Sequence, residues 1–261
     1  MSCAVFYFSS TGNSLNIAKK LASAIGNAEL IAIKNAILNT QISLAGYDKI
    51  GIVFPVYAWG PPNIVAEFAS KLKDGEGKYI FAVVTYGGMP CATLSIFDEM
   101  LKKTGLKLAC GFGIAMPGNY TPLYGAISQS KQEKMFADAD KKMEEIATYI
   151  KSGKKGFIQK GSILINWLFS GIIYKGGIKA FAKSDNKFWV DQNCTKCGIC
   201  AKVCPVKNIV LVDGKPTWQG NCQACMACLQ WCPTKSIQQG KNTAKRKRYH
   251  HPQAKLEDFY V

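Results

Sequence analysis

The sequence predicts an α/β protein in two parts: a doubly wound, five-stranded parallel sheet followed by a small α+β domain. Three observations support this fold class. Strand-length apolar runs alternate with helical patterns over the first 150 residues, eight of the eleven cysteines fall between Cys194 and Cys232, and positive charge gathers in the second part. Hydrophobic residues make up 48% and charged residues 19% of the chain, which permits a sizeable core and excludes disordered, collagen-like and coiled-coil proteins.

Each expected element of the first part follows from a local pattern. Residues 4–8 are a short apolar run, and apolar side chains recur at helical spacing over residues 14–25. The run 50–56 is nearly continuous in apolar residues, as a strand buried on both faces should be. The helix 61–73 opens on two prolines, which suit a first helical turn. The other expected elements are strands at 30–33, 79–85 and 106–116 and helices at 93–103 and 130–151. Ligands of such a sheet bind beyond the carboxyl ends of its strands.

Charge divides the chain at the end of this first part. Residues 1–150 carry 14 basic and 12 acidic side chains, a net charge of +2, whereas the remaining 111 residues carry 19 and 5, a net charge of +14. This asymmetry indicates segments with different roles. We expect a domain at 1–151, a connector at 152–188, a small domain at 189–240 and a basic C-terminal tail at 241–261.

The connector contains an unusually apolar stretch, Ile163–Tyr174. Because it is apolar nearly all round, it predicts a helix buried between the two parts. The alternative is a monotopic contact with a membrane surface, which Trp167, Phe169 and the nearby lysines would support.

No segment has the pattern of a secretion signal or of a membrane span. The chain starts Met1-Ser2-Cys3, without a basic n-region, and the 14-residue run 161–174 is shorter than the roughly 20 residues that cross a bilayer. The clustering of the cysteines is also unlike a secreted disulfide framework. We therefore expect a soluble, cytoplasmic protein.

The clustered cysteines form an internal repeat. Residues 194–205 read C-x-x-C-x-x-C-x-x-x-C-P, and residues 222–233 repeat this pattern with an offset of 28 residues. Three closely spaced thiolates can hold a [4Fe–4S] cluster from one loop, and the fourth Cys of each run ligates the other cluster in proteins with two such runs. Zinc sites and disulfides are the alternatives, but zinc ribbons use two separated C-x-x-C pairs.

This pattern predicts two [4Fe–4S] clusters. The expected ligands of one are Cys194, Cys197, Cys200 and Cys232; those of the other are Cys222, Cys225, Cys228 and Cys204. Residues 190–240 resemble the bacterial two-[4Fe–4S] ferredoxins, with both motifs intact.

A second motif follows the first expected strand. It is the hydroxyl-rich sequence Ser9, Ser10, Thr11, Gly12, Asn13 and Ser14, directly before a helix. Its hydroxyls, its main-chain N–H groups and the positive end of the helix dipole could bind a phosphate monoester. The alternative is an ordinary helix start capped by Ser or Thr.

Residues 4–26 resemble the flavodoxin family, whose loop for the FMN phosphate runs T/S-x-T-G-N-T. The resemblance implies two further loops around the flavin ring, after the third and fourth strands. The first would be Pro55, Val56, Tyr57, Ala58, Trp59 and Gly60, and the second Thr85, Tyr86, Gly87 and Gly88. Tyr57, Trp59 and Tyr86 are the candidate stacking partners for the ring.

Together, the two resemblances identify the chain as similar to the flavodoxin–ferredoxin fusion proteins. They imply a flavodoxin-like domain that binds FMN and a ferredoxin domain with two [4Fe–4S] clusters. The implied function is electron transfer between these cofactors within one chain, linking a one-electron donor to an acceptor. The alternative is an FMN-dependent reductase of a small molecule that is supplied with electrons by its own ferredoxin domain.

The basic C-terminal part indicates the kind of partner. We expect an acidic redox protein that docks by charge, and we place contact with an anionic membrane surface second. Binding to nucleic acid is disfavoured, because the basic tail has few interleaved aromatic residues.

Overall fold

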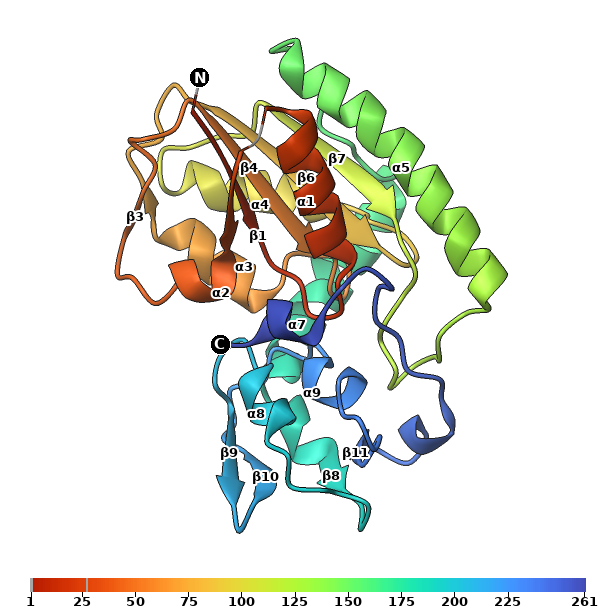
Figure 1. Cartoon of the computed structure of the whole chain (residues 1–261). Coiled ribbons are helices and arrows are strands. Elements are labelled where there is room, and N and C mark those ends of the chain that lie inside the picture. Colours follow the sequence, from red (N-terminus) through yellow and green to blue (C-terminus); the bar gives the residue numbers. More distant parts are fainter. Residues whose placement is uncertain (1, 27) are drawn as a thin grey trace.

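Five parallel strands form the central sheet of the N-terminal part, as the sequence predicts (Figure 1). The computed structural model describes residues 2–26 and 28–261. In sheet order the strands are β2 (Glu29–Ala32), β1 (Cys3–Tyr7), β4 (Lys49–Pro55), β6 (Tyr79–Tyr86) and β7 (Cys110–Ala115). This 2-1-3-4-5 order of parallel strands is that of the flavodoxin-like doubly wound fold.

The register of the sheet brings three loops to one edge. Tyr7 pairs with Val53, and Pro55 pairs with Thr85, so the strands β1, β4 and β6 end close to one another. The main-chain N–H of Val56 also donates to the Thr85 carbonyl at 2.9 Å. This edge therefore carries the three loops in which the sequence predicts flavin contacts.

Helices cover both faces of the sheet. The helices are α1 (Asn13–Ala24), α2 (Ile33–Ala36), α3 (Asn63–Ser70), α4 (Thr93–Lys102) and α5 (Gln129–Lys151). Along β6, Phe81 and Val83 point to the core shared with α1 and α5, while Ala82 and Val84 point to the core shared with α3 and α4. Both faces are thus buried, which explains the continuous apolar runs in the central strands. A small parallel pair, β3 (Ile42–Ser43) with β5 (Leu72–Lys73), was not predicted.

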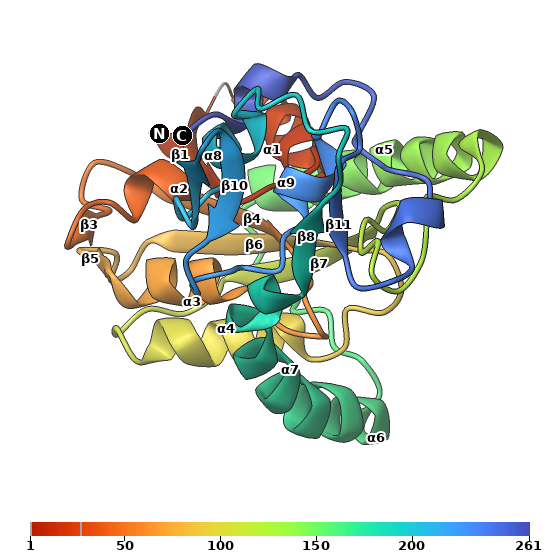
Figure 2. The ribbon, with the colours of Figure 1, turned by 90° about the horizontal axis from the view of Figure 1, so that it is seen from below.

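The connector forms a helical segment, but its expected burial is wrong. The segment consists of α6 (Ile163–Asn166), a π-helical stretch η1 (Trp167–Ile173) and α7 (Tyr174–Ala182). It contacts the rest of the chain along one side only, through residues such as Ser170 and Tyr174. Figure 2 shows this segment standing out from the body of the molecule. No helix in the described part of the chain is both long and apolar enough to cross a membrane.

The small domain has the internal symmetry that its sequence repeat predicts. Its antiparallel pairs are β8 (Phe188–Val190) with β11 (Ile237–Gln239) and β9 (Ile209–Val212) with β10 (Lys215–Trp218); its helices are α8 (Ile199–Lys202), α9 (Ala227–Gln230) and the short η2 (Ser184–Lys187). Each repeat has a left-handed residue just before its helix, Gly198 with φ +74° and Met226 with φ +62°. The 28-residue offset therefore relates two copies of one backbone conformation.

The C-terminal segment 241–261 folds back onto the flavodoxin-like domain instead of extending from the small domain (Figure 1). It contains two short helices, η3 (Thr243–Lys245) and η4 (Leu256–Phe259). Tyr249, His251 and Phe259 are buried. The basic residues at 245–248 lie at the start of this segment, and the residues after them include the buried ones. A high net charge in the segment therefore does not prevent it from packing against the domain.

Candidate functional site

The turn between β1 and α1 has the geometry of an anion-binding loop. Gly12 precedes α1 with φ +103°, and no side chain caps the first turn of this 12-residue helix. The Gly12 N–H donates to Ser9 Oγ at 3.2 Å, which closes the turn. An uncapped helix start offers free N–H groups and the positive end of the helix dipole. The predicted residues Ser9–Ser14 thus fit a phosphate monoester such as that of FMN.

Hydroxyl groups join this phosphate loop to both predicted ring loops. Ser14 Oγ lies 2.8 Å from Thr85 Oγ1, and Ser10 Oγ lies 3.3 Å from the Tyr57 hydroxyl. All four side chains are buried. The structure therefore brings together the three loops that the resemblance assigned separately.

The first ring loop is a tight turn that contacts the connector. Tyr57 and Gly60 exchange two main-chain hydrogen bonds of 2.9 and 3.0 Å, and Ala58 and Trp59 take φ values of +46° and +64°. The Trp59 ring lies 4.5 Å from the Phe169 ring of η1. One face of Trp59 is thus engaged by the connector, a contact that the sequence did not indicate.

The second ring loop is more open. Tyr86 is half-buried, while Gly87 and Gly88 are exposed. A Cβ on Gly87 would come within 2.9 Å of the Gly118 Cα, so glycine is needed for this close approach. The exposed Gly87–Gly88 edge leaves main-chain groups available to a planar ligand.

The C-terminal segment holds the phosphate loop, which sequence reasoning missed. The His251 N–H donates to the Thr11 carbonyl at 2.7 Å, and the Tyr249 hydroxyl donates to Asn13 Oδ1 at 2.5 Å. A Cβ on Gly12 would come within 2.7 Å of the His251 Cβ. The available signal was the aromatic residues that interrupt the otherwise polar tail.

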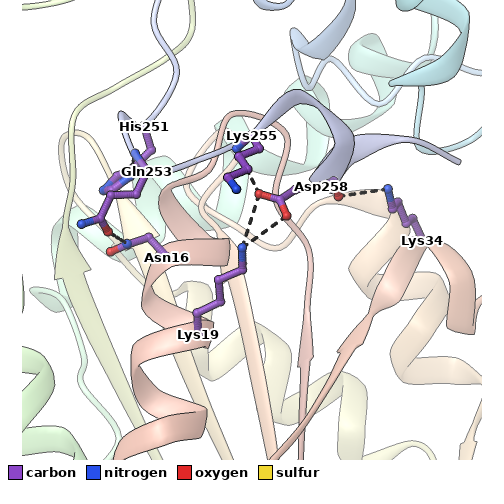
Figure 3. Close-up of polar contacts among 7 residues, drawn as sticks. All are labelled: Asn16, Lys19, Lys34, His251, Gln253, Lys255 and Asp258. Atoms are coloured by element: carbon purple, nitrogen blue, oxygen red, sulfur yellow. Dashed lines mark hydrogen bonds and ion pairs between the residues drawn. The ribbon is translucent and has the colours of Figure 1, made fainter.

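Further polar contacts anchor the segment to α1 and α2 (Figure 3). Asn16 Nδ2 donates to Gln253 Oε1 at 2.5 Å, and Lys19 Nζ lies 3.2 Å from an Asp258 carboxylate oxygen. Lys34 Nζ donates to the Asp258 carbonyl at 3.4 Å. The end of the chain is therefore part of the structure around the phosphate loop.

His251 is electrically neutral in this setting. Burial and, to a smaller extent, the nearby Lys20 lower its pKa to about 4, while Asp140 acts in the opposite direction. Because the imidazole is uncharged at pH 7, it supplies no cation to the loop. Phosphate binding there depends on main-chain N–H groups, hydroxyls and the helix dipole.

The eight motif cysteines line two separate cavities. Cys194, Cys197, Cys200 and Cys232 line one cavity, and Cys204, Cys222, Cys225 and Cys228 line the other. These are the two groups of four that the sequence predicts. The described cysteines form no disulfide. In the same part of the chain, no three His, Cys, Asp or Glu side chains are arranged to hold a single metal ion.

Main-chain donors and burial set the chemistry of these thiols. The N–H groups of Asn208 and Ala224 donate to the sulfurs of Cys204 and Cys222 at 3.2 and 3.3 Å. Such hydrogen bonds tune the potential of a bound cluster. Burial raises the pKa of Cys200 to about 11, so a thiol of this kind must lose its proton when it binds a metal. The residues present therefore fit iron–sulfur clusters in both cavities.

The two groups of cysteines differ in their surroundings. Cys225 packs in the same hydrophobic core as Tyr57. Burial raises the pKa of Tyr57, and a negative charge on Cys225 raises it further, which indicates that the two side chains are near each other. In the other cavity, Cys197 is exposed. One group of four cysteines thus adjoins the first ring loop, while the other reaches the surface.

Direct hydrogen bonds fix the small domain at this edge of the sheet. Trp231 Nε1 donates to the Ser10 carbonyl at 2.9 Å, and Gln223 Oε1 accepts from the Ile64 N–H at 3.0 Å. The Trp231 contact links the residue before Cys232 directly to the phosphate loop.

Comparison with family models agrees with this architecture. A model described as a flavodoxin domain matches residues 4–142, and one described as a 4Fe-4S dicluster domain matches residues 193–237. Because the first match covers more than half of the chain, the protein belongs to the flavodoxin domain family. With its C-terminal 4Fe-4S domain it is a flavodoxin–ferredoxin fusion, a class of FMN and iron–sulfur electron-transfer protein.

Solved structures of flavoproteins also resemble the first domain. An FMN-bound flavoprotein from Lactobacillus acidophilus NCFM is 19% identical, with a TM-score of 0.33, and the match covers 43% of this chain and 91% of that one. The two-electron reduced flavodoxin of Megasphaera elsdenii is 18% identical, with a TM-score of 0.35 and coverages of 43% and 85%. Comparison with curated proteins gave no match.

Proposed function

We propose that the chain carries electrons between two [4Fe–4S] clusters and FMN, in a fixed spatial order. The Cys204, Cys222, Cys225 and Cys228 group is proximal to the flavin, and the Cys194, Cys197, Cys200 and Cys232 group is distal and faces the external partner. The observation that carries this proposal is the packing of Cys225 in the same hydrophobic core as Tyr57 of the first ring loop.

The protein's part in this function is to position the groups. The phosphate loop and the C-terminal segment would hold the FMN phosphate, while Tyr57, Tyr86 and the Gly87–Gly88 edge would surround the ring. When bound, clusters exchange single electrons, and FMN exchanges one or two. Because the cluster sites and the FMN site belong to one chain, electrons can pass between them without waiting for two proteins to meet by diffusion.

The cofactor content tests this proposal first. Anaerobically prepared protein is expected to contain about eight iron atoms and one FMN per chain, because two complete sets of four cysteines and one phosphate loop are present. Metal and flavin analysis is the measurement. About one zinc per cavity with no flavin would overturn the assignment, and about four iron atoms would overturn the second cluster.

An acidic redox protein is the proposed external partner. Residues 189–261 carry 11 basic and 4 acidic side chains, a net charge of +7. Exposed apolar side chains, including Trp189, Leu211 and Val212, lie on the same small domain as the exposed Cys197. An apolar patch with basic surroundings suits a transient interface with an acidic carrier.

Salt and charge variants test this partner. The rate of electron transfer from a reduced acidic ferredoxin is expected to fall several-fold between low and physiological ionic strength, because exposed charges are screened. Neutralising the exposed Lys245 and Lys247 with glutamine should also slow it, whereas Lys73→Gln on the flavodoxin-like domain should not. A rate that is independent of salt would contradict the proposal. Arg246 and Arg248 are unsuitable for this test because they donate inward hydrogen bonds.

A further inference from the structure

The connector helix exposes large apolar side chains. Ile163 is 90% exposed, Leu164 74%, Trp167 63% and Ile172 54%. A scattered exposed leucine is ordinary, but several such residues within three helical turns form a contiguous apolar patch. Exposure of this apolar patch to water is unfavourable, so we expect another surface to cover it.

The opposite side of the same helix is firmly attached to the flavodoxin-like domain. Ser170 Oγ donates to the Trp59 carbonyl at 2.8 Å, and the Tyr174 hydroxyl donates to the Pro61 carbonyl at 2.8 Å. Ser170 Oγ also accepts from the Ala92 N–H at 3.0 Å. The helix is therefore held in place with its apolar side chains exposed, and Figure 2 shows its ribbon projecting from the body of the molecule.

The charged side chains of the connector near the patch are all positive. From residue 156 to residue 184 the sequence contains four lysines and no Asp or Glu. The four are exposed: Lys160, Lys175, Lys179 and Lys183. A helix with an exposed apolar side, a tryptophan and flanking lysines matches the interface of an anionic bilayer, where apolar groups enter the acyl boundary and lysines meet lipid phosphates.

We propose that residues 160–183 form a membrane-surface anchor that lays the connector helix into the headgroup region of an anionic bilayer. The positive charge of the connector is complementary to the negative charge of the lipid headgroups, which favours a bilayer as the surface that covers the patch. A second copy of the chain would bring two sets of four lysines together at the patch, and this repulsion opposes a symmetric dimer. The anchor lies in the plane of the interface and does not cross the membrane.

Flotation of the cofactor-loaded full chain with lipid vesicles tests the anchor. Binding to vesicles of phosphatidylglycerol and phosphatidylcholine is expected to be at least tenfold tighter than to phosphatidylcholine alone. The double variant Leu164→Ser/Trp167→Ser should lose at least tenfold in affinity for the anionic vesicles. Leu38→Ser is the matched control, because Leu38 is 69% exposed on a distant part of the flavodoxin-like domain.

Several outcomes would overturn the anchor. These are absence of binding to anionic vesicles, equal binding to both vesicle types, and equal loss in the Leu38 variant. A concentration-dependent dimer in the absence of lipid that disappears in the double variant would instead assign the patch to a second copy. Unchanged flavin and iron contents in the double variant would show that its folding and cofactor sites are intact.

Discussion

Replacing Cys225 by serine is expected to uncouple FMN from an external electron donor. The variant should keep about four of its roughly eight iron atoms, because the other group of four cysteines is complete. When a reduced ferredoxin is added, the remaining cluster should become reduced, but the rate of FMN reduction should fall at least 100-fold. Stopped-flow absorbance of the flavin and EPR of the reduced cluster measure the two events.

Replacing Cys197 by serine should give a different pattern with the same iron loss. Cys197 is exposed, whereas Cys225 is buried in the same core as Tyr57 of the first ring loop, so the Cys197 variant is expected to lose the entry point from the ferredoxin. Neither the remaining cluster nor FMN should then be reduced rapidly. Cys3→Ser, which lies outside both groups, is the control. Normal FMN reduction in the Cys225 variant would reject the assignment of that group as proximal.

Loss of the C-terminal segment is expected to cost FMN binding while the iron–sulfur sites remain. Ending the chain after Arg248 removes the His251 bond to Thr11 and the Tyr249 bond to Asn13, and affinity for FMN should fall at least 100-fold. Tyr249→Phe should weaken binding about tenfold, because a buried hydrogen bond contributes about 1 to 1.5 kcal/mol. Titration of FMN fluorescence is the measurement.

The matched control for this prediction is Tyr260→Phe, which makes the same chemical change at an exposed position of the same segment. It should bind FMN like the unaltered protein. The iron content of all three variants should be unchanged. Equal FMN affinity in the Tyr249 variant and the unaltered protein would show that the phosphate loop keeps its conformation without this bond.

The main features of the fold could be predicted because local patterns and tertiary structure agree. Continuous apolar runs such as 50–56 coincide with strands buried on both faces, and the turn at Ser9–Ser14 precedes a helix as expected. The repeated cysteine spacing also predicted which thiols line each cavity. In these cases the chemistry of a few neighbouring residues determines the local structure.

The connector and the C-terminal segment could not be predicted in the same way. An apolar helix such as 163–174 is compatible with burial or with exposure, and only its neighbours decide between them. The contacts of Tyr249 and His251 join residues more than 230 positions apart, so no local pattern encodes them. Because most residues of the tail are polar, its composition did not indicate that a few aromatic residues attach it to the flavodoxin-like domain.

The position of Tyr249 and His251 against the phosphate loop also bears on the order of events during synthesis. The N-terminal domain leaves the ribosome first and begins to fold there, yet its phosphate loop gains neighbours from residues that are translated after the cysteine-rich domain. We therefore expect stable flavin loading to wait until the cysteine-rich domain has also been made. FMN would then be held firmly only in a molecule that already contains the ferredoxin domain that supplies it with electrons.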